Sequence, residues 1–203
     1  MDYLNINVKI KFITEILGSQ PMDSDIFSRF IASQAPTPEA QAEEIEVALS
    51  QEEKEIIQGK TQFPRDREGY CCFLDYQIRG FLKEAGNNLK EQMSLKAVKS
   101  KIDNFVFIDP RYIRISPEIK DVPDTLQRPL RAQTPQGPRV CLASSEMIPE
   151  GAELSFKIKI IKNKDIDSKV IREILSYGEL QGLGQWRNGS YGRLEVKEFT
   201  VMS

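Results

Sequence analysis

The stretch LNINVKIKF, Leu4 to Phe12, alternates between apolar and polar side chains along its whole length. A period of two is typical of a β-strand with one face buried and the other face in water. The stretch LSFKIKII, residues 154–161, repeats the same pattern. Both strands carry lysines on the polar face, and we interpret these as solvated positions that oppose aggregation, in preference to a binding face.

A helix and a further strand are expected after the second of these strands. Residues 163–180 place apolar side chains at helical spacing, with Asp165 or Asp167 as the N-cap and Gly178 at the end of the helix. The following stretch RLEVKEFTV, residues 193–201, predicts the last strand.

The first half of the chain repeats this order with interruptions. LDYQIRGFLKEAGNNL, residues 74–89, carries an apolar stripe at helical spacing. Residues 103–115 then predict a strand with a kink or bulge around Asp109-Pro110. The complete order β-α-β-β-α-β predicts an α+β fold of the ferredoxin-like type, with an antiparallel sheet.

We expect a single domain over residues 1–203 with two insertions of opposite charge. The first, at about 35–65, is predicted to be helical and acidic, because residues 38–58 hold seven glutamates and a single lysine. Such a segment is most simply a solvated helix face, with a protein-binding surface as the alternative, and it would repel nucleic acid. The segment TEILGSQPMDSD, which precedes it, is predicted to be a turn region.

The second insertion, at about 116–150, is predicted to be a basic loop or hairpin. Residues 126–140 contain Arg128, Arg131 and Arg139, no acidic residue, and several prolines and glycines. Arg111 and Arg114 lie just upstream and could extend the basic patch. Two interpretations stay open: contact with a polyanion, or ion pairing with the acidic insertion.

Composition excludes several classes of protein. The net charge is −2, so binding to a polyanion would need a local patch. The chain has no histidine, which excludes a histidine general base, a Ser-His-Asp triad and histidine metal ligands. Three cysteines, two of them adjacent, fit neither a disulfide framework nor a zinc site. We expect no metal, no cofactor, no membrane span and a cytoplasmic protein; an enzymatic role is not favoured.

The stretch GLGQWRNGSYGRLEV, residues 182–196, combines four glycines with two aromatic residues and two arginines. One interpretation is a hairpin turn at residues 187–190, with Trp186 packed on the sheet. The other is a phosphate-binding loop, because glycines let backbone N–H groups approach phosphates and arginines supply bidentate donors.

In three places and in the right order, the chain resembles the RAMP superfamily, the repeat-associated proteins of CRISPR systems. The opening strand leading into KFITEILGSQP resembles the first strand and turn of that family. FLDYQIRGFLKEAG resembles the entry to its first helix, and GLGQWRNGSYGRLEV resembles its glycine-rich loop before the last strand. Members of the superfamily cleave CRISPR precursor RNA or coat the guide RNA in effector complexes.

The resemblance implies binding of single-stranded RNA and partnership with other subunits of a ribonucleoprotein complex. Trp186 and Tyr191 would stack on splayed bases. In the superfamily, an insertion at the position of the basic one often protrudes and contacts RNA. The other residues that the resemblance assigns to RNA are Arg79, Gly80, Lys83, Gly182, Gly184, Gln185, Arg187, Gly189, Ser190, Gly192 and Arg193.

Three classes of function follow. The first is a non-catalytic or weakly catalytic RNA-binding protein of the RAMP type. The second is a metal-independent endoribonuclease of the same superfamily, although the absence of histidine departs from many RNA-cleaving members. The third is a protein-interaction module, such as a decoy or inhibitor of a CRISPR effector, which the acidic segment would suit.

Overall fold

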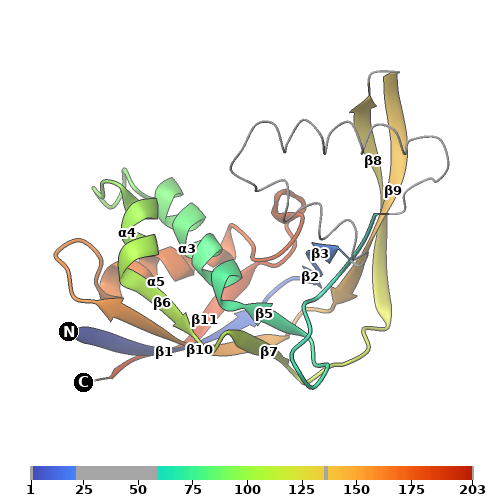
Figure 1. The fold of residues 1–203 in the computed structure, drawn as a ribbon. Coiled ribbons are helices and arrows are strands. Elements are labelled where there is room, and N and C mark those ends of the chain that lie inside the picture. The colour runs from blue at the N-terminus through green and yellow to red at the C-terminus, as the bar shows by residue number, and fades with distance from the viewer. Residues whose placement is uncertain (1, 22–58, 135–136, 203) are drawn as a thin grey trace, which may run out of the picture.

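The computed structural model describes residues 2–21, 59–134 and 137–202, which form two β-sheets with helices packed against the larger sheet (Figure 1). The elements in chain order are β1 (Tyr3–Phe12), β2 (Ile16–Leu17), β3 (Gln20–Pro21), β4 (Gly59–Gln62), β5 (Cys72–Leu74), α3 (Asp75–Asn88), α4 (Val98–Phe105), β6 (Val106–Asp109), β7 (Tyr112–Ser116), β8 (Asp124–Thr134), β9 (Gly137–Ile148), β10 (Glu153–Ile161), α5 (Ser168–Ser176), the 3₁₀ turns η1 (Tyr177–Glu179) and η2 (Arg187–Gly189), and β11 (Leu194–Met202).

The larger sheet has the strand order β11-β1-β10-β7-β5, and β6 also pairs with β10. All of these pairings are antiparallel, and Val8 of β1 lies opposite Phe156 of β10. With β6 and β7 counted as one interrupted strand, this order is that of the split βαβ arrangement, so the α+β, ferredoxin-like prediction is confirmed. The alternating apolar residues of β1 and β10 are buried, because they face the helices.

The helices cover one face of this sheet (Figure 1). Helix α3 buries the predicted stripe, with Ile78, Phe81 and Leu82 almost fully inaccessible. Asp167 is the N-cap of helix α5, and its carboxylate accepts a hydrogen bond of 2.9 Å from the N–H of Val170. The chain leaves α5 as the turn η1, in which a Cβ on Gly178 would lie 2.4 Å from the Leu194 side chain.

Several elements differ from the sequence-based predictions. Helix α4 was not predicted, because it is only eight residues long and no side chain caps its N-terminus. Of the kinked strand predicted over residues 103–115, residues 103–105 belong to α4, and the remainder forms two strands, β6 and β7, which both pair with β10. The turn after β1 contains the short strands β2 and β3, which belong to the second sheet.

The second sheet has the order β2-β9-β4-β3, and β8 pairs with β9 along an antiparallel hairpin. Strand β4 pairs in parallel with β9. In Figure 1 the far end of the β8–β9 hairpin extends away from the larger sheet. The predicted basic insertion therefore contains this hairpin, whereas most of the predicted acidic insertion, residues 35–58 with the segment predicted to be helical, lies outside the described residues.

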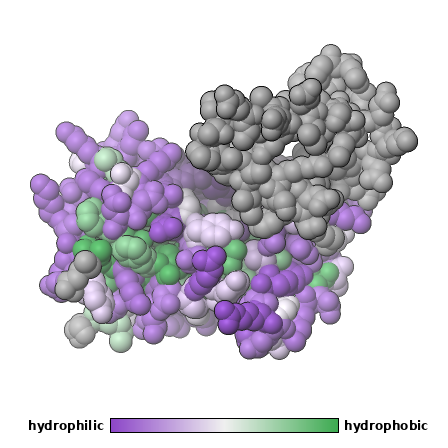
Figure 2. All heavy atoms as spheres, viewed as in Figure 1, coloured by the Kyte–Doolittle hydropathy of each residue, from purple (hydrophilic) through white to green (hydrophobic). Residues whose placement is uncertain are grey.

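Hydrophilic residues cover most of the described surface that Figure 2 shows, with a smaller group of apolar side chains among them. Within residues 2–21, 59–134 and 137–202, no helix has both the length and the apolar composition needed to cross a bilayer.

Candidate functional site

The glycine-rich segment connects α5 to β11 and is therefore not a hairpin between two strands. Its tip is the turn η2, closed by hydrogen bonds from Gly189 N–H to the Trp186 carbonyl and from Ser190 N–H to the Arg187 carbonyl, each 2.9 Å. Trp186 and Ser190 have φ values of 53° and 67°, in the left-handed region that residues other than glycine seldom adopt. Strained backbone of this kind is concentrated at functional sites, which makes the segment a candidate site.

Two of the glycines hold the arms of this segment together. A Cβ on Gly182 would lie 1.9 Å from the Tyr191 carbonyl oxygen, and one on Gly192 would lie 1.9 Å from the Leu183 carbonyl oxygen. The N–H of Gly192 donates to the Glu15 carbonyl at 2.7 Å. The space beside these two glycines is therefore filled by the protein's own backbone.

The other two glycines of the segment also have close neighbours. A Cβ on Gly189 would come within 2.9 Å of the Trp186 ring, and Gly184, at φ +100°, lies near the Leu17 carbonyl. Gly189 therefore packs against the Trp186 ring, whereas Gly184 packs against β2 and the Phe73 ring.

Trp186 lies at the centre of a stack of aromatic and cationic groups. Its ring stacks on Tyr191 with centroids 5.2 Å apart and an interplanar angle of 15°. The guanidinium carbon of Arg128, from β8, lies 4.3 Å from the centroid of the Trp186 ring. Trp186 therefore packs on a residue of the second sheet but stays 42% exposed, so its ring is only partly covered. Aromatic surface thus stays accessible beside a cation.

Arg128 is the unusual member of this stack, because only 8% of it is exposed. Among the described residues, its Nε and Nη1 find no hydrogen-bond partner, and no carboxylate forms an ion pair with it. Burial lowers the pKa of the guanidinium, although the nearby Tyr191 acts in the opposite direction. A buried cation with unpaired donors is costly unless an anion reaches it, so this site is suited to a negatively charged ligand.

A polar cleft of about 760 Å³ lies between α3 and residues 177–190. Helix α3 contributes Glu84 and Asn88 to its lining. Residues 177–190 contribute the Trp186 ring and the side-chain amides of Gln181, Gln185 and Asn188. The Nδ2 of Asn88 donates to Gln181 Oε1 at 2.8 Å, which joins the two walls. Arg187 forms an ion pair with Glu84 across the same cleft. Pockets of this size hold small ligands or single groups of a larger one.

Gln185 connects this cleft to the second sheet. Its Oε1 accepts hydrogen bonds from Ser145 Oγ at 2.8 Å and from Thr61 Oγ1 at 3.0 Å. Ser145 is 2% exposed and belongs to β9, and Thr61 belongs to β4. The parallel pairing of β4 with β9 therefore fixes the position of the loop.

The structure brings some of the other sequence-predicted residues close to the cleft and places others elsewhere. Arg193 donates from Nε to the Glu179 carbonyl, beside the loop. Lys83 forms an ion pair of 2.9 Å with Asp103 of α4, and Arg79 is half-buried on α3. Arg111 is exposed just before β7. Arg131 and Arg139 belong to β8 and β9, but their side chains lie outside the described part of the structure.

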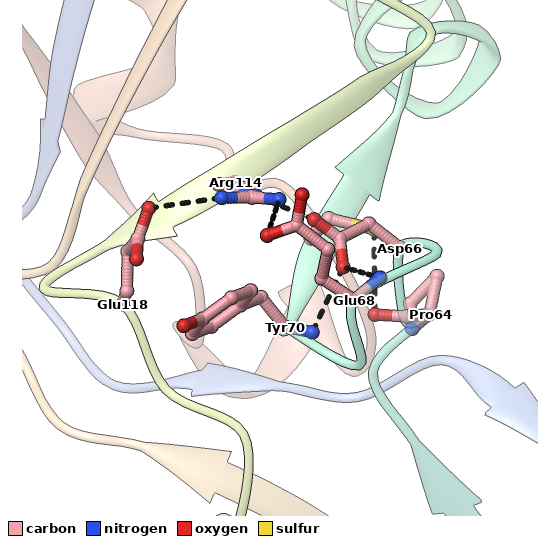
Figure 3. A network of polar contacts seen from close by, with 7 residues as sticks. Pro64, Asp66, Glu68, Tyr70, Arg114 and Glu118 are labelled. Atoms are coloured by element: carbon pink, nitrogen blue, oxygen red, sulfur yellow. Dashed lines mark hydrogen bonds and ion pairs between the residues drawn. The ribbon is translucent and has the colours of Figure 1, made fainter.

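Arg114 lies in a network of carboxylates, shown in Figure 3. It forms ion pairs with Asp66, with Glu68 at 2.7 Å and with Glu118 at 3.2 Å, and it lies over the Tyr70 ring. The hydrogen bond to Asp66 is the main reason why the pKa of Arg114 is raised. Its positive charge is therefore largely compensated by the protein itself.

Asp66 is the buried partner in this network, with 7% of its side chain exposed. Burial alone would raise its pKa, but hydrogen bonds from the N–H groups of Tyr70 and Glu68 and from Arg114 lower it below the usual value. A depressed carboxylate pKa contributes stability above the unfolded-state value, about 3.9, which is lost as the pH falls through the folded-state pKa.

Asp66→Asn is accordingly expected to lower the melting temperature at pH 7. The difference from the unmodified protein should shrink progressively as the pH falls below about 4 and vanish below the folded-state pKa of Asp66, where both proteins lack the charge. Thermal unfolding followed by circular dichroism across this range is the measurement, and Asp103→Asn, on the exposed surface of α4, is the control. A difference that is constant with pH would contradict this account of the network.

The fold and site define an α+β protein in which a ferredoxin-like sheet and a second sheet together position a polar cleft beside a cation–aromatic stack. No family model matches the sequence, and no curated protein matches it. A search of solved structures finds a similar chain in the cryo-EM structure of the Type III-B Cmr-beta bound to cognate target RNA.

That chain is 12% identical, with a TM-score of 0.53, and the match covers 99% of the present chain but 61% of the other. The likeness shows a shared fold. The present chain thus spans less than two thirds of the length of this structural relative. Membership of the RAMP superfamily stays a prediction.

Proposed function

We propose that this chain binds single-stranded RNA, as a RAMP-like subunit or relative of a CRISPR-type ribonucleoprotein effector complex. The observation that carries the proposal is Arg128, a buried guanidinium with unpaired donors that lies on the half-exposed Trp186 ring. Proteins hold single-stranded RNA with this combination of a cation for phosphate and an aromatic ring for bases. The similar fold of a chain in the RNA-bound Type III-B Cmr-beta structure also supports the proposal of RNA binding.

The proposed interface is centred on the glycine-rich segment and the β8–β9 hairpin. Arg128, Arg187 and Arg193 would contact phosphates, and Trp186 with Tyr191 would supply the stacking surface. Arg131 and Arg139 would extend the interface along the hairpin, as the sequence predicts. Arg79, Lys83 and Arg111 would add long-range attraction, whereas Arg114 would add least because three carboxylates hold it. Gly182 and Gly192 would act by keeping the loop closed.

Arg187→Ala combined with Arg193→Ala is expected to weaken binding of single-stranded RNA. The slope of log affinity against log salt should flatten by up to about two contacts' worth, roughly 1.4 in all, since each phosphate contact contributes about 0.7 for a single strand. Fluorescence anisotropy over a salt series, with melting temperatures measured in parallel, is the test. Unchanged affinity in a stable double variant would remove these arginines from the interface.

Two further variants sharpen this comparison. Glu84→Gln releases Arg187 from its ion pair and should raise RNA affinity by roughly twofold to fivefold, the worth of an exposed pair. Lys157→Ala removes an exposed cation of β10 outside the interface and should leave affinity almost unchanged.

A protein-interaction role is the second candidate, favoured by the seven glutamates of residues 38–58. An acidic segment can imitate nucleic acid or dock on a basic partner. Nucleic acid that copurifies with the full chain would support RNA binding, and its absence together with capture of a basic CRISPR effector subunit would support the second candidate. Metal-independent cleavage of added RNA would instead point to an endoribonuclease.

A further inference from the structure

We infer that the cleft between α3 and residues 177–190 is a nucleobase pocket, which takes one base splayed out of single-stranded RNA and recognises its hydrogen-bonding edge. The inference rests on the proposed function and adds to it a site for sequence preference. Four of the residues that line the cleft carry primary amides: Asn88, Gln181, Gln185 and Asn188.

The chemistry of this lining suits a neutral, polar ligand group. Primary amides carry both donors and acceptors, and proteins use Asn and Gln to form paired hydrogen bonds with base edges. The charged residues of the cleft, Glu84 and Arg187, form an ion pair with each other. A pocket built for phosphate would present net positive charge, so a base fits this lining better than a phosphate does.

The contacts within the lining leave specific atoms for a ligand. Asn88 donates through Nδ2 to Gln181 Oε1, so the two amides are hydrogen-bonded to each other. The Oδ1 acceptor of Asn88 and the Nε2 donors of Gln181 remain for a ligand. A neighbouring donor and acceptor complement the Watson–Crick edge of an RNA base, because that edge carries both kinds of group in all four bases.

Gln185 is oriented in a similar way. Thr61 and Ser145 both occupy its Oε1, so its Nε2 donors remain for the ligand. The buried hydroxyl of Ser145 holds this amide in place before any ligand arrives, which reduces the ordering cost of binding.

Size and position agree with this occupant. A cleft of about 760 Å³ accommodates a purine or pyrimidine ring together with part of its sugar. Trp186 lines the cleft and also contacts Arg128, so a base inside would lie next to the cation proposed to hold phosphate. RNA recognition by sequence usually takes this form, with an unstacked base held near an anchored backbone.

The test uses a double variant of the full chain, Asn88→Leu with Gln181→Met, which removes the hydrogen-bonding atoms but nearly preserves side-chain size. The matched control is Asn104→Leu with Gln92→Met, because both residues are exposed and lie outside the cleft. Affinities are measured for four homopolymeric RNAs of equal length at several salt concentrations.

We expect the unmodified protein and the control to prefer one base by roughly fivefold to a hundredfold, the worth of one paired contact. The cleft variant should lose this preference while its salt slope is unchanged, because phosphate contacts remain. Equal affinity of the unmodified protein for all four RNAs, or a preference retained by the cleft variant, would overturn the inference and leave RNA binding intact.

Free nucleoside monophosphates separate this inference from the proposed function. If the protein binds no RNA at low salt but its cleft binds a monophosphate, as seen by ligand-observed NMR and abolished in the cleft variant, then the pocket is supported and the RNA-binding proposal fails. If neither ligand binds, both are overturned.

Discussion

Gly192→Ala is expected to lower the free energy of unfolding by roughly 3 kcal/mol or more, from a clash and from backbone strain combined. The added Cβ would lie 1.9 Å from the Leu183 carbonyl oxygen, and the opposing group is backbone that cannot move aside. The residue also has φ +73°, a conformation that alanine adopts only at a cost. The hydrogen bonds that Gly192 makes with Leu183 and Glu15 would be distorted as well.

Gly80→Ala is the matched control for this prediction. Gly80 lies within α3, and a Cβ there would meet nothing within 4 Å, so alanine should stabilise the helix by about 0.5–1 kcal/mol. Urea unfolding of the two variants beside the unmodified protein is the measurement. Equal stability of Gly192→Ala and the unmodified protein would mean that the arms of the loop are not packed together as described.

Arg128→Met is expected to change stability and RNA affinity in opposite directions. An apolar side chain of similar length removes a buried charge with two unpaired donors, so the free energy of unfolding should rise by about 1–3 kcal/mol in the absence of ligand. The lost cation–π contact with Trp186 offsets part of this gain. RNA affinity should fall tenfold or more, because charge-assisted hydrogen bonds contribute roughly 1.5–3 kcal/mol each.

Arg172→Met provides the comparison, because Arg172 also lies over an aromatic ring, that of Phe199, but is exposed on α5. It should alter neither property appreciably. Thermal unfolding without ligand and anisotropy with single-stranded RNA give the two readouts. A fall in stability with unchanged RNA affinity for Arg128→Met would show that Arg128 serves the fold and not a ligand.

The strands of the larger sheet could be predicted from sequence because their information is local. The alternation in LNINVKIKF reports directly on which side chains face the helices, and so does the stripe of α3. Helix α4 gave a shorter signal, because it has only eight residues with two buried positions, Val98 and Ile102, and no side chain caps its N-terminus. The second sheet was missed because its pairings join β4 to β9, about eighty residues away, and such pairings leave little trace in either segment.

The candidate site shows the same division. Trp186 and Arg187 could be singled out because they share a short glycine-rich segment. Asn88 gave no individual signal, since its role depends on Gln181, 93 residues away along the chain. The side-chain amides within residues 181–188 are the sequence feature from which the cleft could have been inferred. Arg114 shows the converse case: the sequence groups it with basic residues, but its neighbours in space are acidic.

The anchoring of Gln185 by Thr61 and Ser145 has a consequence for protein engineering. Residues 177–193 cannot be transplanted alone onto another ferredoxin-like scaffold, because two of the groups that fix their conformation come from a different sheet. A functional graft would have to carry β4 and the base of the β8–β9 hairpin with the loop. For the same reason, insertions that alter the register of β4 against β9 would reshape the cleft without touching any residue that lines it.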